Sequence, residues 1–386
     1  MTTEATNCQR LREHLGYLQM TTAAEQLSAE LDRAPKQKLS PTRSWRTCWT
    51  LGTTRGRTCF GFWWTRKRSR RWLRTERARR PKRSRFFIVP VALSVAVLGP
   101  GGVGGLLAAL LARGGNSVEV LASESTSRAI AERGLRVESQ RFGDFQVSVR
   151  SGVRLEGPVD ACFITVKNTQ LTEALKRVPA DALGDALVVP FLNGIDHVDL
   201  LRSFYTPASV AAATLRVETA RVDPGLIRQT SPFASIEIAA SGSNRDRVER
   251  VAAQLKAGGI DVRVRDDETS MLWDKLSFLV PLALLTTHEG TNAGAIRTRW
   301  REDTLAVISE VAAVAAAEGA AIDPEEVVRF LDSVPETMES SMQRDQAAGR
   351  PLEIDAIGGA VVRRAARAGV DVPVTARLVE ELRTRG

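Results

Sequence analysis

The stretch SVAVLGPGGVGG at residues 94–105 decides the fold of this chain. A short apolar strand runs into a loop in which Gly99, Gly101 and Gly104 fit G-x-G-x-x-G, and the apolar run LLAALLARGG continues as a helix. In such a turn the first glycine permits a tight bend, the second lets the backbone approach a pyrophosphate, and the third lets helix and strand pack closely. A glycine-rich turn that binds nothing is the alternative. We expect dinucleotide binding here, at the helix N-terminus, by Gly99, Pro100, Gly101, Gly102, Val103 and Gly104.

The same region also permits a different interpretation. Residues 86–112 contain no charged side chain and follow a basic run, a combination that can indicate a membrane span or signal anchor. However, glycines and a proline cluster in the middle of this run, and the apolar piece before them is too short to span a bilayer. A buried strand followed by a buried helix explains the run better, so we expect no membrane segment.

The charge of the 386-residue chain is unevenly distributed. The formal net charge is +9, but residues 41–85 carry 16 Lys or Arg against one acidic residue, and the chain from residue 86 on is net acidic. A segment this charged and this poor in aliphatic residues cannot build a core, so we predict that it is disordered. Because five of the seven tryptophans interleave with its arginines, an alternative role is nucleic-acid binding through phosphate contacts and stacking.

Residues 8–34 predict a pair of amphipathic helices. They resemble the N-terminus of the IstB-like helper ATPases of insertion sequences. No GxxxxGK[ST] loop occurs in the chain, so the resemblance implies no ATPase activity. We interpret residues 1–85 as an N-terminal extension that arose by gene fusion or from a mis-called start.

Cysteines and histidines argue against a disulfide framework and a metal site. The four cysteines include no C-x-x-C pair, and the three histidines are scattered without ligand spacing. This cysteine usage favours a reducing compartment, which we expect to be the cytoplasm.

From residue 94 on, the pattern predicts an α/β fold followed by helices. Apolar strands at 118–122, 161–167 and 186–194 alternate with helices, which indicates a parallel sheet covered on both faces. Residues 135–150 predict a hairpin around Gly143. After strands and one helix, 245–257, between residues 209 and 262, the chain becomes helical, at 272–286, 303–318, 324–332, 354–366 and 374–383. We expect a Rossmann-type dinucleotide-binding domain at 92–268, an all-helical C-terminal domain at 269–386, and an active site between them.

Three further segments make the prediction specific. They are FLNG at 191–194, LWDKLSF at 272–278 and SSMQRDQAAGRPLEIDAIGGAVV at 340–362. Together with the glycine loop they resemble the ketopantoate reductase (2-dehydropantoate 2-reductase) family over residues 94–382. The resemblance implies NADPH-dependent reduction of ketopantoate to pantoate, in pantothenate and coenzyme A biosynthesis.

The residue chemistry agrees with a reductase. A lysine ammonium can polarise a ketone and donate a proton to its oxygen, so Lys275 is the candidate general acid. The resemblance implies that Glu353 contacts the substrate and helps place this lysine, and that Ser341 binds the substrate carboxylate. Asn193, at a strand end, would bind substrate or cofactor, and Lys167 would lie near the cofactor. The structural alternatives are a surface lysine, a turn residue at 193, and a helix cap or polar loop at 353 and 341.

Two features depart from the family. Leu279 and Ala283 stand four and eight residues after Lys275, where the family commonly has asparagines, and Gly358 stands where an asparagine is common. Since spacings of four and eight share one helical face, a related NAD(P)-dependent 2-oxo acid reductase with a more apolar substrate is an alternative.

The cofactor signals conflict. Ser123 replaces a frequent arginine after the second strand, and Glu124 and Arg128 follow it. NADP is our prediction, with Ser123 and Arg128 at its 2′-phosphate. We expect a small-molecule 2-oxo acid as substrate and no membrane partner. Helix packing in the C-terminal half is compatible with a homodimer. A nucleic-acid-binding or transposition-linked protein that uses the basic arm is the alternative from another class.

Overall fold

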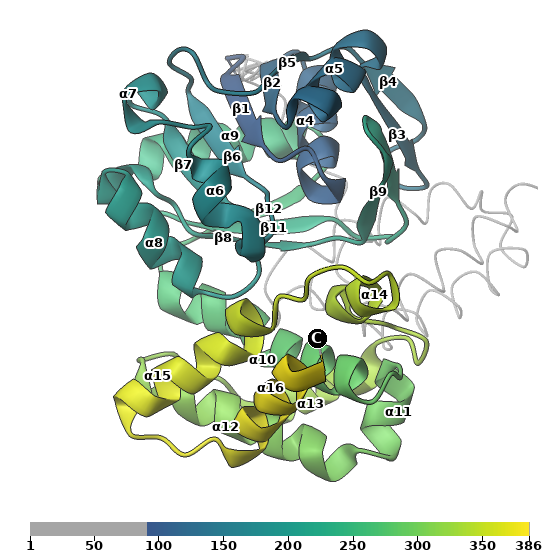
Figure 1. The fold of residues 1–386 in the computed structure, drawn as a ribbon. Coiled ribbons are helices and arrows are strands. Elements are labelled where there is room, and N and C mark those ends of the chain that lie inside the picture. Colours follow the sequence, from purple (N-terminus) through teal and green to yellow (C-terminus); the bar gives the residue numbers. More distant parts are fainter. Residues whose placement is uncertain (1–90, 386) are drawn as a thin grey trace, which may run out of the picture. The chain divides into compact units, whose positions relative to one another are not determined.

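The computed structural model describes residues 91–385 (Figure 1). The predictions for residues 1–85, namely the paired helices, the IstB resemblance and the disordered basic segment, therefore lie outside the described residues.

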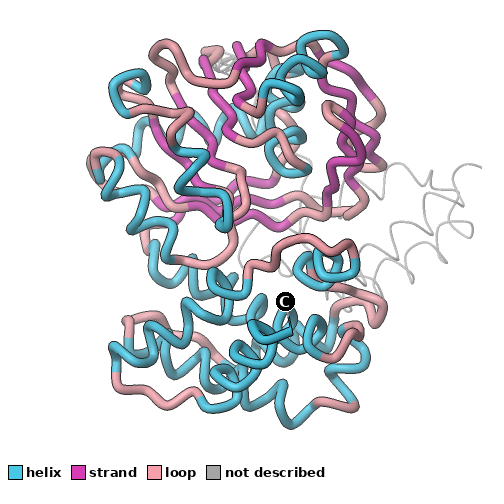
Figure 2. The backbone as a smooth tube through the Cα atoms, in the orientation of Figure 1, coloured by secondary structure: helices cyan, strands magenta, loops and turns pink. Residues whose placement is uncertain are grey.

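A five-stranded parallel sheet forms the centre of the first domain, as predicted (Figure 2). Leu98, at the end of the central strand, lies beside Leu121 on one side and Ile164 on the other. The strands run β5 (Arg150–Gly152), β2 (Ser117–Leu121), β1 (Ser94–Leu98), β6 (Ala161–Ile164) and β7 (Leu187–Pro190). The strands that follow β1 in the chain are added first on one side of it and then on the other. A ligand crevice is expected at the carboxyl end of β1, where this change of side occurs.

Alternate residues of β1 enter two different cores. Val95 and Val97 pack in one hydrophobic cluster with the leucines of the first helix, whereas Ala96 and Leu98 pack in a second cluster on the opposite face. This alternation follows the two-residue period of a strand, and it explains why the sequence of the strand is continuously apolar.

The helices of this domain are α4 (Gly102–Arg113), α5 (Glu124–Arg133), α6 (Leu171–Leu175), α7 (Ala180–Leu183), α8 (Asp196–Phe204) and α9 (Arg245–Ala257).

Two smaller sheets complete the α/β domain. The predicted hairpin around Gly143 is confirmed, with Leu135 paired to Val147. It belongs to a sheet with the order β4 (Phe145–Val147), β3 (Leu135–Ser139), β10 (Leu226–Gln229), β9 (Thr219–Asp223). The third sheet has the order β12 (Asp261–Arg265), β11 (Ser235–Ala239), β8 (Ala213–Arg216). Neither separate sheet was anticipated from the sequence.

From residue 268 on, the described chain consists of helices and their connecting loops without any strand, as predicted. They are α10 (Glu268–His288), α11 (Ala293–Thr298), α12 (Arg301–Ala317), α13 (Pro324–Ser333), α14 (Ser341–Ala347), η4 (Asp355–Gly359), α15 (Ala360–Ala368) and α16 (Pro373–Arg385). Within residues 91–385, no helix is long and apolar enough to cross a membrane.

Two short helices and one π-helical turn in this domain were not predicted from the sequence. The short helices α11 and α14 were missed, although Asn292 and Ser340 cap their first turns. The helix expected at 354–366 begins with the π-helical turn η4 before α15. Such turns are rare and often occur at functional sites.

Ion pairs and one close backbone contact join the two domains. Asp196, at the start of α8, pairs with Arg364 of α15 at 3.0 Å, and Arg364 also pairs with Glu318 at 2.8 Å. Gly194 has a φ of 81°, and a Cβ there would lie 2.0 Å from the backbone oxygen of Ala356 in η4. The strand end that carries Asn193 is thus pressed against the helical domain.

This contact predicts a specific loss on substitution. Gly194→Ala adds left-handed strain of about 1–2 kcal/mol and an overpacking cost of about 1–3 kcal/mol. Gly115→Ala is the matched control, because its φ is 87° and nothing lies within 4 Å of its Cβ position, so it carries the strain alone. In urea denaturation, Gly194→Ala should lower the free energy of unfolding more than Gly115→Ala does. Equal decreases in the two variants would contradict the close approach of Gly194 to Ala356.

Candidate active site

The geometry of the glycine loop is compatible with the three predicted roles. Gly99 has a φ of 87°, and its N–H donates to the Leu121 oxygen at 3.0 Å. A Cβ on Gly104 would lie 2.2 Å from Thr165 Oγ1, so helix and strand meet as closely as only glycine allows. A Cβ on Gly101 would meet nothing nearer than 3.9 Å, so this stretch of backbone faces open space where a pyrophosphate could approach.

The other loop residues support this cradle. A Cβ on Gly102 would lie 2.8 Å from the Thr219 oxygen of β9, which explains the glycine by packing. Pro100 is buried, and Val103 packs against the core. The first-turn N–H groups of α4 have no partners within the helix, and no acidic residue lies in that turn. The loop therefore fits an anionic dinucleotide.

Lys275 lies in the first half of α10, and its amine reaches the α/β domain. Its Nζ donates to Asn193 Oδ1 at 3.0 Å. Burial and, to a smaller extent, the nearby Arg216 cation lower the pKa of Lys275 from 10.5 to about 8, against the opposing effect of Glu353. At neutral pH the amine is therefore mostly protonated but close to its titration point, as a general acid requires.

Glu353 lies just before η4, and its carboxylate faces the α/β domain instead of capping its own helix. Oε2 accepts from Asn193 Nδ2 at 3.1 Å, and Oε1 accepts from the Asn168 backbone N–H at 2.9 Å. Glu353 is only 8% exposed. Lys275, Asn193 and Glu353 thus form one hydrogen-bonded chain across the domain junction.

Sequence reasoning missed two residues that contact predicted site residues, one at Asn193 and one at Lys167. Asn168 donates from its side chain to the Asn193 oxygen at 2.7 Å, which fixes the loop after β7. Asp345 of α14 accepts from Lys167 at 2.6 Å and from Arg350 at 2.8 Å. Asn168 could have been found, because it directly follows a predicted strand end. The pairing of Lys167 with Asp345 depends on the missed helix.

Ser341 lies at the start of a helix and not in the polar loop weighed as its structural alternative. It is the first residue of α14 and is exposed. Its neighbour Ser340 is the buried cap, which accepts from the Gln343 N–H and from Thr286 Oγ1, each at 3.0 Å. Capping is thus assigned to Ser340, and the Ser341 hydroxyl makes no hydrogen bond within residues 91–385.

The apolar departures do not all face the same space. Leu279 is partly buried at the edge of the helical core, and Ala283 is fully buried in it. A Cβ on Gly358 would lie 2.5 Å from Val379 Cγ2. Gly358 therefore points into the helical core, and the expectation that it removes an amide from the substrate site is wrong. Leu279 alone remains a candidate for contact with substrate.

His197 lies beside the site without a partner. It is 3% exposed, and neither ring nitrogen has a hydrogen bond within the described residues. Burial, with the Lys275 charge nearby, lowers the pKa of His197 to about 3, so the ring stays neutral. The described residues contain no cluster of three potential metal ligands.

Comparison with known proteins identifies the family. The family description "Ketopantoate reductase PanE/ApbA" matches residues 95–242, and its C-terminal counterpart matches residues 267–386. The chain belongs to the ketopantoate reductase family. The 2-dehydropantoate 2-reductase of Mycobacterium tuberculosis is 30% identical over 301 residues, 75% of this chain and 96% of its own length. That of Halobacterium salinarum is 29% identical over 299 residues, 75% and 98% of the two chains.

Solved structures agree with this ketopantoate reductase assignment. A family ketopantoate reductase from Ralstonia eutropha superposes with a TM-score of 0.68 at 30% identity, over 75% of this chain and 97% of that one. A D-mandelate dehydrogenase in complex with NADH and anilino(oxo)acetate superposes with a TM-score of 0.70 at 22% identity, over 75% and 97% of the chains, which shows the fold alone. The chain is thus an oxidoreductase of an NAD(P)-dependent family.

The lowered pKa predicts that Lys275 costs stability. Because the folded state binds this proton less tightly than the unfolded state, the penalty is fully present below pH 8 and is lost as pH rises through 8 to 10.5. Lys275→Met should therefore unfold at a higher temperature than the wild type at pH 7, by a margin that shrinks toward pH 10. Lys256→Met, at an exposed lysine, should change little at either pH. A destabilised Lys275→Met would contradict the buried-cation picture.

Proposed function

We propose that this ketopantoate reductase family member reduces ketopantoate to pantoate with NADPH, as a step of pantothenate and coenzyme A biosynthesis. The observation that carries the proposal is the chain Lys275–Asn193–Glu353, which holds a titratable ammonium near the carboxyl end of β7, at the same edge of the sheet as the glycine loop after β1. The cytoplasmic location and the homodimer expected from the sequence stay predictions.

The residues divide the chemistry as follows. Bound NADPH supplies the hydride that reaches the carbonyl carbon. Lys275 donates its proton to the carbonyl oxygen as negative charge develops there, and its positive charge polarises the bond beforehand. Asn193 orients the amine through its Oδ1, and Glu353 fixes the Asn193 amide from the other side. Ser341, with an exposed hydroxyl at the start of α14, would bind the substrate carboxylate.

The cofactor site uses the glycine loop and the strand ends beside it. We assign the pyrophosphate to Gly99, Gly101 and Gly104 and the α4 N-terminus, and Ser123 and Lys167 to flanking parts of the dinucleotide. Lys167 would act together with Asp345, which already holds its amine. Asn193 lies near enough to Lys275 to contact either substrate or nicotinamide.

A second candidate substrate is a more apolar 2-oxo acid. Leu279 favours it, because this partly buried residue follows Lys275 by one helical turn and offers no hydrogen bond to a hydroxyl group. Ketopantoate carries such a hydroxyl, and a site built to bind a hydroxyl normally rejects analogues without one. The reaction class is the same for both candidates.

NADPH oxidation by the full chain tests the proposal. With ketopantoate we expect turnover that falls above about pH 8, where Lys275 loses its proton. Lys275→Ala should lower kcat by about 10²–10⁴, while NADPH binding, followed by fluorescence, stays within twofold. Tight NADPH binding without turnover on any 2-oxo acid would reject the reductase activity.

Leu279→Asn tests the choice between the two substrates. Restoring an amide on the Lys275 face should raise kcat/KM for ketopantoate by about tenfold relative to an unbranched apolar 2-oxo acid, in keeping with one added hydrogen bond. Leu305→Asn is the control, because Leu305 is 39% exposed on α12. If both variants leave the ratio of kcat/KM values unchanged, Leu279 does not face the substrate.

A further inference from the structure

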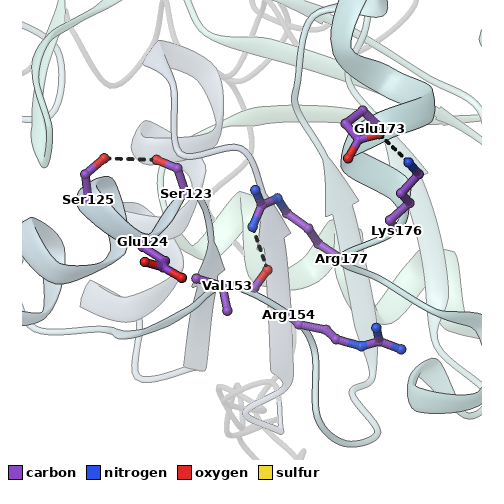
Figure 3. Close-up of a pocket in the computed structure, with 8 residues that line it drawn as sticks. All are labelled: Ser123, Glu124, Ser125, Val153, Arg154, Glu173, Lys176 and Arg177. Atoms are coloured by element: carbon purple, nitrogen blue, oxygen red, sulfur yellow. Dashed lines mark hydrogen bonds and ion pairs between the residues drawn. The ribbon is translucent and has the colours of Figure 1, made fainter.

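A cavity of about 690 Å³ opens at the carboxyl ends of β2 and β5 (Figure 3). Eight residues from three parts of the chain line it: Ser123, Glu124, Ser125, Val153, Arg154, Glu173, Lys176 and Arg177. The cavity contains none of the catalytic residues described above. Its lining includes three cations and two carboxylates.

The strand order places this cavity on the opposite side of the glycine loop from Lys275. The sheet runs β5-β2-β1-β6-β7, and the loop follows β1 in the middle. Asn193 follows β7 on one side, whereas Ser123 and Val153 follow β2 and β5 on the other. A dinucleotide whose pyrophosphate lies at the central strand therefore has its nicotinamide toward Lys275 and its adenosine ribose toward this cavity.

Arg177 is held in place within the cavity. Its Nη1 donates to the backbone oxygens of Ala122 and Val153, each at 3.0 Å. In Figure 3 the guanidinium lies between Ser123 and the Glu173–Lys176 pair. Neither Arg177 nor Arg154 forms an ion pair with a carboxylate within the described residues. An arginine anchored by two neutral carbonyls keeps its full charge and its remaining donors for another partner.

The charge balance of the cavity favours an anion. Glu173 and Lys176 neutralise each other at 2.5 Å, which leaves Arg154 and Arg177 against Glu124 alone. Arg128 follows in α5 but does not line the cavity. The N-terminus of α5 opens onto the same space through Ser123 and Ser125 and adds its positive end.

We propose that Arg177, assisted by Arg154, binds the 2′-phosphate of NADPH in this cavity. The inference rests on the proposed function for the presence of the dinucleotide. It assigns to Arg177 the role that the sequence analysis expected Arg128 to share with Ser123. The two cations come from the segment just after α6 and from the loop after β5, and they compensate for the missing arginine at position 123.

Equilibrium binding separates this inference from the reaction. The dissociation constants of NADPH, NADH, adenosine 2′,5′-bisphosphate and 5′-AMP are measured by fluorescence and calorimetry, without a 2-oxo acid. Arg177→Gln and Arg154→Gln should each weaken NADPH and the bisphosphate by about tenfold or more, as expected for a lost charge-assisted bond. NADH and 5′-AMP should bind as to the wild type, and the salt dependence of NADPH binding should decrease. Arg128→Gln is the matched control and should bind like the wild type.

Each alternative result has a distinct meaning. The inference would be overturned if Arg154→Gln and Arg177→Gln bound NADPH as tightly as the wild type and Arg128→Gln do. It would also be overturned if the wild type bound NADH more tightly than NADPH. Arg154 is exposed, so its variant keeps the test valid if Arg177→Gln fails to fold. NADPH preference that depends on these arginines, without ketopantoate turnover, would support the inference and reject the proposed function. A wild type that binds no dinucleotide would reject both.

Discussion

One ammonium group, partly withdrawn from water at a junction between two domains, is the constraint that the surrounding packing has to accommodate. Lys275 belongs to the helical domain, yet its hydrogen-bond partner Asn193 belongs to the α/β domain. Desolvation penalises the cation, so the site can persist only because packing elsewhere supports it. Trp273, two residues earlier, supplies part of that support, because it is buried in the helical core and its indole N–H donates to Glu318 at 3.1 Å.

This constraint explains why polar residues cross the junction in series. Glu318 also holds Arg364, which pairs with Asp196 just beyond the Asn193–Gly194 turn. The same two segments, α10 and the loop after β7, are therefore joined twice, once through the Lys275–Asn193–Glu353 chain and once through this ion-pair network. A shift of one domain against the other would break both. Such double attachment fixes the position of Lys275 relative to Asn193, and fixed positioning of this kind is what the proposed proton transfer would require.

The sequence predicted those features that depend on local pattern. The strand, glycine loop and helix at 94–113 were predicted because an apolar run interrupted by clustered glycines fits a buried strand and a buried helix better than a membrane span. The Lys275–Asn193–Glu353 grouping was predictable only through family resemblance, because the three residues are up to 160 positions apart and no periodicity joins them. The pairing of Lys167 with Asp345 was missed for a physical reason: α14 has seven residues, too few for a hydrophobic repeat, and its cap Ser340 looks like any loop serine.

The departures from the family show why a substitution must be judged by the direction in which its side chain leaves the backbone. Gly358 and Leu279 both replace asparagines, but Leu284 and Val379 already fill the space beside Gly358. An amide at 358 would need that core to be rebuilt, so the glycine reflects packing and carries no information about substrate. Leu279 follows Lys275 by one turn of α10 and retains some exposure, so its chemistry acts on whatever lies against the amine. Of the two substitutions, only the one at 279 therefore bears on the choice between the two proposed substrates.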